Sequence, residues 1–493
     1  MGPLSRQARS VASIDQKSTP DRSRPQHVRR AEATGLVVVL SATFLGQFDF
    51  FVVNVAGPSI RDALRAGAGI LELIVGGYAF AYAAGLMTAG RLGDLLGFRR
   101  MFLIGVVGFG IASLLCGVSQ TAPQLVAARL LQGGTASVML PQVLAYITAS
   151  VEASRRARAI AWYAVAAGLG GICGQVLGGV LVQGAGWGWR WIFLVNLPVV
   201  LAAAVLGAVV LPRPGRGSRP EFDVGGAAGV ALTVAAVLVP LTLGPGHGWP
   251  AWTALAFGTA PIFLVATVTW ERRLTQRGAR AVVPLHLFGV RTFTAGLLAI
   301  AAFMLFFPSF VFTLALLLQD GLRLEPFEAG LVFVPAAVAF SLSSLRARQL
   351  FGRFGLRAPA AAAGLTALGL IGLILAAWMG AEHASVAVIT VCAAVMSLGN
   401  GVVMPTLTTL ALVDVDADAA GSASGLIATV HQFASAVGVA IVGTVFFEIA
   451  GTGGRSVETV HAAVIAGLVD LLLLGAMTAS LVGIRRSRGP LPR

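Results

Sequence analysis

Residues 90–100 read GRLGDLLGFRR, a short basic segment with three glycines that separates two apolar runs of the chain. A second segment of the same kind, RARQLFGRFGLR, occupies residues 346–357 and again separates two apolar runs. The two segments align when Gly97 is placed opposite Gly355. Each has the character of a tight loop between two neighbouring helices, so the sequence predicts that one structural unit occurs twice in this chain.

A second coincidence supports the repeat. Gly174 and Gly179, five residues apart in one apolar run, correspond to Gly438 and Gly443 in a later run. Both matches relate each helix of a first half to the eighth helix after it. The simplest interpretation is two related six-helix halves separated by an inserted pair of helices.

The composition identifies the solvent of most of the chain as lipid. Of 493 residues, 57% are hydrophobic and 11% are charged, with a mean hydropathy of +0.85. Ordinary soluble domains carry about 25% charged and 45–50% apolar residues. A soluble fold and a wholly disordered chain are therefore excluded.

A membrane-spanning helix needs about 20 mostly apolar residues, and the sequence contains fourteen such runs. They are 35–57, 70–89, 101–119, 123–148, 159–183, 190–211, 225–245, 252–270, 294–317, 328–345, 358–380, 384–410, 425–449 and 460–484.

These runs predict an all-α polytopic membrane protein with two six-helix bundles. The predicted domains are a disordered tail at 1–34, a first bundle at 35–211, a linker with two inserted helices at 212–293, a second bundle at 294–484 and a tail at 485–493. Parallel repeats of this kind are typical of transporters, whose binding site lies between the halves near the membrane midplane.

Basic residues predict the orientation. With the N-terminus inside, 29 Lys and Arg residues lie in the inner segments and 5 in the outer segments. Cytoplasmic loops are enriched in Lys and Arg, so both termini are expected in the cytoplasm. The net charge of +14 is spread between apolar runs, which suits a lipid surface and argues against nucleic acid as a partner.

The three cysteines lie far apart in apolar runs, so we expect neither disulfides nor a metal site.

Two charged residues inside predicted spans are the main candidates for function. Asp49 lies in FLGQFDFFVVNVAGPSI, about 12 Å below the predicted outer end of its helix at 1.5 Å per residue. Arg129, in AARLLQGG, lies about 9 Å below the same surface. A charge at a helix centre costs about 2.5–3.5 kcal/mol on insertion scales, so both side chains should face protein or water. They form either a structural ion pair or a proton or cation site, with Gln47, Asn54 and Gln132 as polar neighbours.

Five further ionisable residues lie within or at the ends of the predicted spans. Asp470, in GLVDLLLLGAM, lies near the midplane and is either a second titrating group or a charge packed against a neighbouring helix. His431 is expected to be a packing histidine. Glu72, Glu328 and Glu448 lie at the ends of predicted spans, where side chains can reach water.

The predicted helix at 159–183 is unusually rich in glycine. Small residues let helices approach closely, and many glycines make a helix pliable, which suits a hinge or a seal between alternating states. The six glycines are Gly168, Gly170, Gly171, Gly174, Gly178 and Gly179.

Several of these segments together resemble the major facilitator superfamily. GRLGDLLGFRR resembles its loop signature between the second and third helices, LVAARLLQGG its fourth-helix arginine motif, and ICGQVLGG its fifth-helix antiporter motif. DFFVVNVAGPSI and WGWRWIFLVNLPV further resemble the fourteen-span drug:proton antiporter branch. The resemblance covers nearly the whole chain after residue 34.

The resemblance implies roles for particular residues. Asp49 would couple protons or bind a cationic drug, Arg129 would assist proton transfer, and Asp470 is kept as a further coupling candidate. A conformational latch on the cytoplasmic side would comprise Gly90, Gly93, Asp94, Gly97, Arg99 and Arg100. The antiporter-like motif would comprise Gly170, Gly174, Gln175, Gly178 and Gly179. Gln175 replaces the usual proline, which leaves antiport and symport both open, and Phe51 replaces a threonine that often follows the helix-1 acid.

The sequence therefore predicts a non-enzymatic, proton-coupled exporter of hydrophobic or cationic small molecules in the cell membrane. The proton gradient supplies the energy and no cofactor is expected; partners are the substrate, protons and lipid, and the oligomeric state is not determined by the sequence. The alternatives are a narrow exporter of one endogenous metabolite or antibiotic, and an uptake symporter. Ser424 and His431, seven residues apart, imitate a nucleophile and a base, but neither has an orienting acid. No GxxxxGK[ST] loop for ATP is present.

Overall fold

The computed structural model describes residues 26–184, 188–212, 223–244, 248–277, 285–415, 420–451 and 456–488. Every regular element in these ranges is a helix, which confirms the predicted all-α class. In the first part of the chain the helices are α2 (Gln26–Leu64), α3 (Ala68–Leu96), α4 (Phe98–Val118), α5 (Ala122–Met139), α6 (Pro141–Ser150), α7 (Ala153–Gly184), η1 (Gly188–Arg190), α8 (Trp191–Leu194), α9 (Asn196–Val210), α10 (Val224–Leu243) and α11 (Ala251–Gln276). The later helices are η3 (Leu285–Gly289), α12 (Arg291–Leu316), the π-helical turn η4 (Leu317–Gly321), α13 (Pro326–Phe354), α14 (Arg357–Gly380), η5 (Ala381–His383), α15 (Val386–Leu412), α16 (Ala420–Ala450) and α17 (Ser456–Arg488).

Twelve of the described helical segments are long and apolar enough to cross a membrane, so the chain is a multi-pass membrane protein. All fourteen predicted runs fall on helices, but two of them are not among these twelve. The run at 123–148 is divided into α5 and α6 at Pro141, and the run at 225–245 falls on α10, whose apolar part is shorter. The count of fourteen spans stays a prediction.

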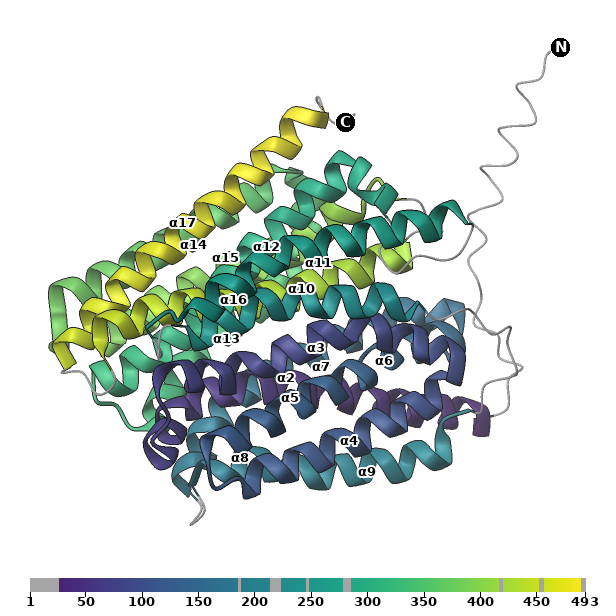
Figure 1. Cartoon of the computed structure of the whole chain (residues 1–493), viewed down its shortest axis with the longest axis horizontal. Helices are drawn as coiled ribbons and strands as arrows, with labels where there is room; N and C mark the ends of the chain where they lie inside the picture. Colours follow the sequence, from purple (N-terminus) through teal and green to yellow (C-terminus); the bar gives the residue numbers. More distant parts are fainter. Residues whose placement is uncertain are drawn as a thin grey trace.

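The packing of the helices repeats. In what we call the first half (α2–α9), α2 contacts α7 and α9, α3 contacts α5, and α4 contacts α5 and α9. In the second half (α12–α17), α12 contacts α16 and α17, α13 contacts α15, and α14 contacts α15 and α17. Figure 1 shows the first half in purple and blue on one side of the molecule and the second half in green and yellow on the other. The helices pair in the way the sequence repeat predicts; the domain boundaries themselves stay a prediction.

The two loops that revealed the repeat also match in geometry. The helices that precede them, α3 and α13, each have 29 residues. Each ends directly before a glycine with a positive φ, 87° at Gly97 and 55° at Gly355. Side chains other than glycine rarely adopt this backbone conformation, so the glycines allow the tight reversal into α4 and α14.

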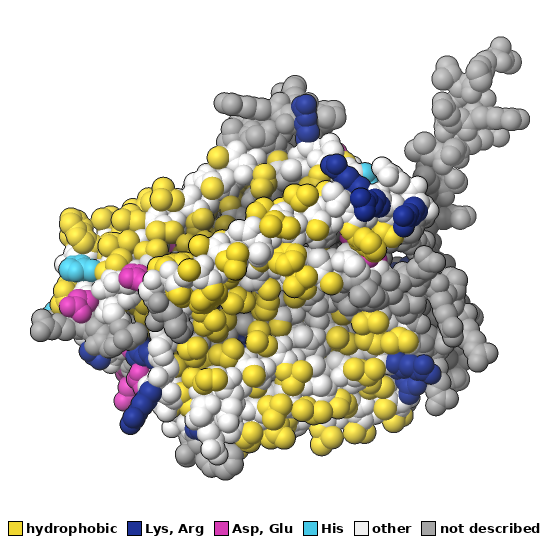
Figure 2. Space-filling view, viewed as in Figure 1, with side chains coloured by type: hydrophobic (Ala, Val, Ile, Leu, Met, Phe, Trp, Pro, Cys, Tyr) yellow, Lys and Arg dark blue, Asp and Glu magenta, His cyan; other side chains and the backbone are white. Residues whose placement is uncertain are grey.

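The two halves meet along two helix pairs, α3 with α16 and α7 with α13. The helices between the halves in sequence, α10 and α11, pack on each other, and α10 also contacts α3 and α16. The far side of α11 is exposed and apolar, with Leu255 71% and Ile262 65% exposed. In Figure 2 hydrophobic side chains cover the middle of the visible face, and charged side chains lie toward the ends of the helices. This is the surface expected of a protein embedded in lipid.

Candidate functional site

The local sequence fixes how α5 begins. The hydroxyl of Thr121 accepts a hydrogen bond from the backbone nitrogen of Gln124 at 3.5 Å, and the side-chain oxygen of Gln124 accepts one from the nitrogen of Thr121 at 3.3 Å. This reciprocal cap satisfies free donors at a helix start. Pro123 in the first turn is also compatible with a helix start. The cap fixes the register of the helix so that Arg129, two turns later, faces the interior of the first half.

Arg129 forms a fully buried ion pair with Asp49 of α2. Both side chains have 0% exposure, and Nη1 of Arg129 donates to Oδ2 of Asp49. Gln132 of α5 donates to Oδ1 of Asp49 at 2.7 Å, and Asn196 of α9 donates to the same oxygen at 3.1 Å. We call these four side chains the Asp49 cluster. Its donors fit the ionised form of the carboxyl group, because charge-assisted hydrogen bonds are the stronger ones.

The guanidinium of Arg129 has further partners in the first half. Its Nε donates to the carbonyl oxygen of Ile74 in α3 at 3.0 Å. It also lies over the ring of Tyr78, 4.8 Å from the centroid, and 5.8 Å from the ring centroid of Phe193. Its Nη2 is buried without a hydrogen-bond partner. The ion pair therefore ties α2, α3, α5 and α9 together, and a change of charge at Asp49 would be felt by all four helices.

The sequence predicted part of this cluster. Asp49 and Arg129 meet, as their similar depths predicted, and Gln132 is their neighbour. Asn54 instead donates to the carbonyl of Phe50 in its own helix, and Gln47 lies against α7. Asn196 was not predicted as a neighbour, although it lies within the quoted segment WGWRWIFLVNLPV.

Ser113 of α4 extends the cluster. Its hydroxyl oxygen accepts a hydrogen bond from Gln132 at 2.9 Å, and the side chain is 0% exposed. This residue could not be predicted from the sequence, because a serine in an apolar run gives no signal by itself. It brings α4, which packs on α5, into contact with the Asp49 cluster.

Asp470 lies in the second half and belongs to a separate site. Its carboxyl group is 0% exposed, and its Oδ1 accepts a hydrogen bond from the hydroxyl of Ser309 in α12 at 2.9 Å. Its Oδ2 is buried without a partner. The role of Asp470 in coupling stays a prediction.

The glycines of α7 make two different close contacts. A Cβ at Gly170 would lie 2.5 Å from the carbonyl oxygen of Phe44, and one at Gly174 would lie 2.6 Å from that of Phe48, both in α2. Gly179 faces the other half, where a Cβ would lie 2.5 Å from the carbonyl oxygen of Pro326. Of the other members of the motif, Gly178 also faces α2, and the side chain of Gln175 is 8% exposed.

The corresponding glycines of α16 repeat this division. Gly438 contacts the carbonyl of Leu305 in α12, within its own half. Gly443 faces the carboxyl group of Glu72 in α3, across the boundary between the halves. In each repeat the first glycine therefore packs within a half, and the glycine five residues later packs between the halves.

Several polar contacts join the halves at one end of the bundle, which we call the Arg61 end. Arg61 of α2 binds Asp320 of η4 through two hydrogen bonds, of 2.6 and 3.0 Å. Gln319 of the same turn donates to the carbonyl of Val55 at 2.8 Å. Gln183 and Glu325 add a hydrogen bond of 2.9 Å between α7 and the start of α13. These contacts hold the two halves together at the Arg61 end.

The predicted latch lies at the opposite end, near Gly97. Gly90 and Asp94 are outside the residues whose side chains the structure describes. Arg99 donates to the carbonyl of Ala208, near the C-terminal end of α9, where a positive charge is favourable. Arg100 is exposed, and Gly93 packs against Gln142 of α6. The latch function stays a prediction.

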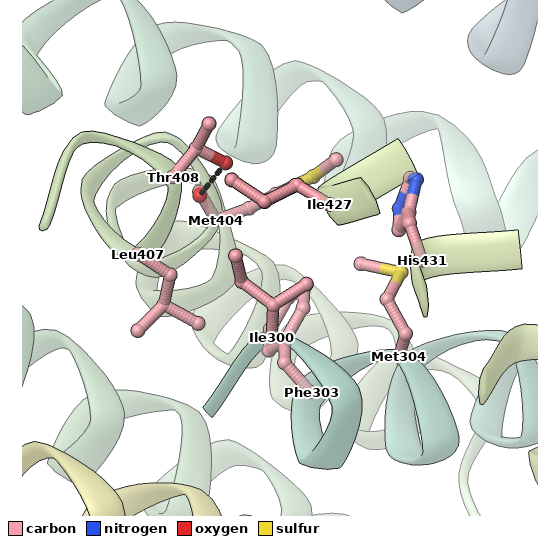
Figure 3. A pocket seen from close by; sticks show the side chains of 8 residues that line it. All are labelled: Ile300, Phe303, Met304, Met404, Leu407, Thr408, Ile427 and His431. Atoms are coloured by element: carbon pink, nitrogen blue, oxygen red, sulfur yellow. Dashed lines mark hydrogen bonds between the residues drawn. The ribbon is translucent and has the colours of Figure 1, made fainter. Parts of the chain in front are cut away.

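A small pocket in the second half lies between α12, α15 and α16 (Figure 3). Its lining is mostly apolar and includes Met304, Met404 and Ile427, with His431 beside Met304. Thr408 also lines it, and its hydroxyl donates to the carbonyl of Met404 at 3.4 Å. Within the described residues, no group of three His, Cys, Asp or Glu side chains is placed to hold a metal ion.

Comparison with known proteins identifies the family. The sequence model of the Major Facilitator Superfamily matches residues 39–439. This chain belongs to the major facilitator superfamily. The similarity therefore extends over most of the chain and includes both halves of the transporter. A solved structure has a similar fold: a bacterial homologue of the human lysosomal transporter Spinster, inward-facing and unoccupied, superposes with a TM-score of 0.68 at 16% identity, covering 92% of this chain and 97% of that one.

Relatives of this superfamily member are named as exporters and resistance proteins. The probable actinorhodin transporter of Streptomyces coelicolor is 36% identical over 431 residues, which cover 87% of this chain and 74% of that protein. The cephamycin export protein of Amycolatopsis lactamdurans is 33% identical and covers 93% and 94% of the two chains. The multidrug resistance protein Stp of Mycobacterium tuberculosis is 31% identical, covering 83% of this chain and 75% of its own.

Proposed function

We propose that this transporter exports hydrophobic small organic molecules in exchange for protons that bind at Asp49. Its relatives are antibiotic and multidrug exporters of the same superfamily, which supports efflux as the direction of transport. The observation that carries the proposed coupling is the Asp49 cluster, a fully buried carboxylate whose countercharge is a single arginine.

Protonation of Asp49 removes the negative charge of the Asp49 cluster. A neutral carboxyl group no longer compensates the charge of Arg129, and an uncompensated charge in a buried pair costs about 3–5 kcal/mol. Arg129 must then find water or another acceptor, so the packing of α2 against α5 changes. Because α2 packs on α7 along Gly170 and Gly174, and α7 contacts α13 at Gly179, this change has a contiguous path to the boundary between the halves.

The geometry also bears on the substrate. Both oxygens of Asp49 are occupied by donors and are buried, so a cationic drug does not reach them in this conformation. Apolar side chains are available instead between the halves. Phe51 of α2 contacts Phe307 of α12 with ring centroids 6.3 Å apart, and Phe307 stacks on Phe340 of α13. Rings of this kind favour hydrophobic and aromatic molecules.

One proton is energetically sufficient. A charge that crosses 100 mV releases about 2.3 kcal/mol, and each factor of ten in concentration costs about 1.4 kcal/mol. One proton per cycle therefore supports roughly a 50-fold gradient of a neutral substrate. No further cofactor is needed in this scheme, and the protein acts as a transporter without enzymatic chemistry.

The excess of basic residues at the Gly97 end supports the orientation. We place the protein in the plasma membrane with both termini and the Gly97 end in the cytoplasm, and the Arg61 end outside. The contacts at the Arg61 end then close the outer side, and alternating access requires them to separate during export.

The test has two stages. Cells that express the protein are screened with a panel of dyes and antibiotics, with and without a protonophore, to find a transported compound. That compound is then followed in proteoliposomes with wild type, Asp49→Asn and, as a matched removal of an exposed acid, Glu448→Gln. We expect Asp49→Asn to lose pH-driven export but to keep exchange of labelled for unlabelled compound, while Glu448→Gln keeps both. Unchanged pH-driven export by Asp49→Asn would refute the coupling role.

The same panel examines a second candidate function. Two of the relatives are named for single compounds, actinorhodin and cephamycin, which favours a narrow exporter of one endogenous product. Resistance to one chemical class alone would support the narrow exporter, and resistance to unrelated classes would support multidrug export. Uptake driven by an inward proton gradient would instead identify a symporter.

A further inference from the structure

Glu72 is a buried acid that the coupling scheme above does not use. It lies in the second turn of α3, where α3 contacts α16, and it is only 2% exposed. Its Oε2 is buried without a hydrogen-bond partner. A Cβ at Gly443 of α16 would lie 2.9 Å from its Oε1. The carboxyl group is thus packed against bare backbone of the opposite half, at the Arg61 end.

The internal repeat shows that close packing between the halves does not require an acid at the position of Glu72. The alignment of Gly97 with Gly355, which matches α3 to α13 residue for residue, places Gly330 opposite Glu72. At the boundary between α7 and α13, Gly330 lies close to the carbonyl of Gln175, where a Cβ would be 3.1 Å from the oxygen. One boundary between the halves therefore contains a glycine and the other a buried carboxyl group at the equivalent position.

No described basic group compensates Glu72. On helices packed against α3, Arg129 pairs with Asp49 and Arg61 pairs with Asp320. On α16, Glu448 is exposed, and His431 lies about 18 Å from Gly443 at 1.5 Å per residue.

The other helices that contact α3 contribute nothing closer. The described part of α10 contains no ionisable residue, and Arg99 and Arg100 of α4 are at the opposite end. Burying an ionised carboxylate alone is strongly unfavourable, so contact between α3 and α16 favours the protonated acid.

We propose that Glu72 is a second proton-binding site, which takes up a proton from the Arg61 side when the halves close there and returns it to the same side when they separate. Closure converts the carboxylate and one proton into the neutral acid, and hydration on opening allows the proton to leave. The proton is not carried across the membrane, so Glu72 sets how closure depends on external pH without entering the transport stoichiometry. The inference rests on alternating access, the mechanism of the proposed function.

The sign of the effect distinguishes Glu72 from its neighbours. If Glu72 controls closure, acidification favours the closed Arg61 end, with up to about a tenfold change in the ratio of closed to open molecules per pH unit for one group. Loss of the contact between Arg61 and Asp320 has the opposite effect, because it removes a link between the halves at this end and so favours opening.

The experiment measures closure directly. Spin labels are attached at Arg65→Cys in the first half and Val457→Cys in the second, both exposed, with Cys116, Cys173 and Cys392 replaced by alanine. Interspin distances are recorded in lipid nanodiscs across a pH series. All proteins compared carry Asp49→Asn, so that protonation of Asp49 does not move the halves. We expect the short-distance population of Asp49→Asn to grow on acidification, and that of Glu72→Gln/Asp49→Asn to stay high at every pH.

Two further variants keep the test decisive. Glu448→Gln should leave the pH response unchanged, and Gly443→Ala, whose new methyl group displaces Glu72, should lower the short-distance population. Asp49→Asn should lose pH-driven transport but keep the pH-dependent distance change, so the two proposals fail independently. A pH response that persists in Glu72→Gln/Asp49→Asn, or an opening of Asp49→Asn on acidification, would overturn the proposal.

Discussion

The two halves each bury an aspartate within a long apolar helix, but they surround it differently. Asp49 of α2 accepts hydrogen bonds from three side chains, namely its countercharge Arg129, Gln132 of α5 and Asn196 of α9. Asp470 of α17 has one hydroxyl partner, Ser309 of α12, and an oxygen without a partner. The repeat matches α2 with α12 and α9 with α17, so the two polar contacts join equivalent pairs of helices.

This difference indicates which of the two aspartates changes its charge during transport. The first half is built to hold an ionised carboxylate, whose protonation leaves Arg129 unpaired. The second half offers Asp470 one hydrogen bond and no charge, which suits a neutral acid. We therefore expect the first half to respond to protons, and the second half to keep its charge constant while it supplies apolar surface.

The largest effect is expected from breaking the ion pair on the side of the arginine. Arg129→Met leaves Asp49 buried without a countercharge and should destabilise the protein by about 3–5 kcal/mol. The double variant Arg129→Met/Asp49→Asn removes both charges and should recover much of this loss. Thermal unfolding in detergent measures both; a double variant as unstable as the sum of the single variants would show that the two residues act independently.

An intermediate effect is expected at a glycine contact between two helices of the first half. Gly174→Ala places a methyl group 2.6 Å from the carbonyl oxygen of Phe48 and should cost about 1–3 kcal/mol. Gly168→Ala is the matched control on the same helix, because a Cβ there meets nothing within 4 Å. Equal stability of the two variants would contradict the close contact between α7 and α2.

The smallest effect is expected at the aspartate of the second half. Asp470→Asn keeps an acceptor for Ser309, and a typical hydrogen bond contributes only about 1 kcal/mol. We expect stability within about 1 kcal/mol of wild type, and pH-driven transport that is retained. Loss of coupling in this variant, with normal folding, would give Asp470 a role like that of Asp49 and would remove the contrast between the halves.

The features that were predicted from the sequence are those that depend on the position of a residue along its helix. Spans follow from apolar runs, and the meeting of Asp49 with Arg129 follows from their similar depths at 1.5 Å per residue. What the sequence did not predict depends on rotation about the helix axis. Asn196 faces Asp49 while Gln47 faces α7, and neither direction is set by sequence spacing alone.

Glu72 is the clearest case of this limit. The expectation that acids at span ends reach water is confirmed for Glu328 and Glu448, which are exposed. It is wrong for Glu72, because α3 turns this side chain toward α16, and a partner helix from the other half covers it. Contacts between halves are distant in sequence and leave no local pattern.

The most direct measurement of the central claim is the infrared difference spectrum of the carboxyl groups upon acidification. It is recorded for the Glu72→Gln protein, which removes the second proposed site, and for the same protein with Asp49→Asn or Asp470→Asn added. We predict that the signal of a buried carboxyl group gaining a proton is present in Glu72→Gln, persists with Asp470→Asn and disappears with Asp49→Asn. A signal that persists with Asp49→Asn and disappears with Asp470→Asn would contradict the account, because the responsive acid would then lie in the second half.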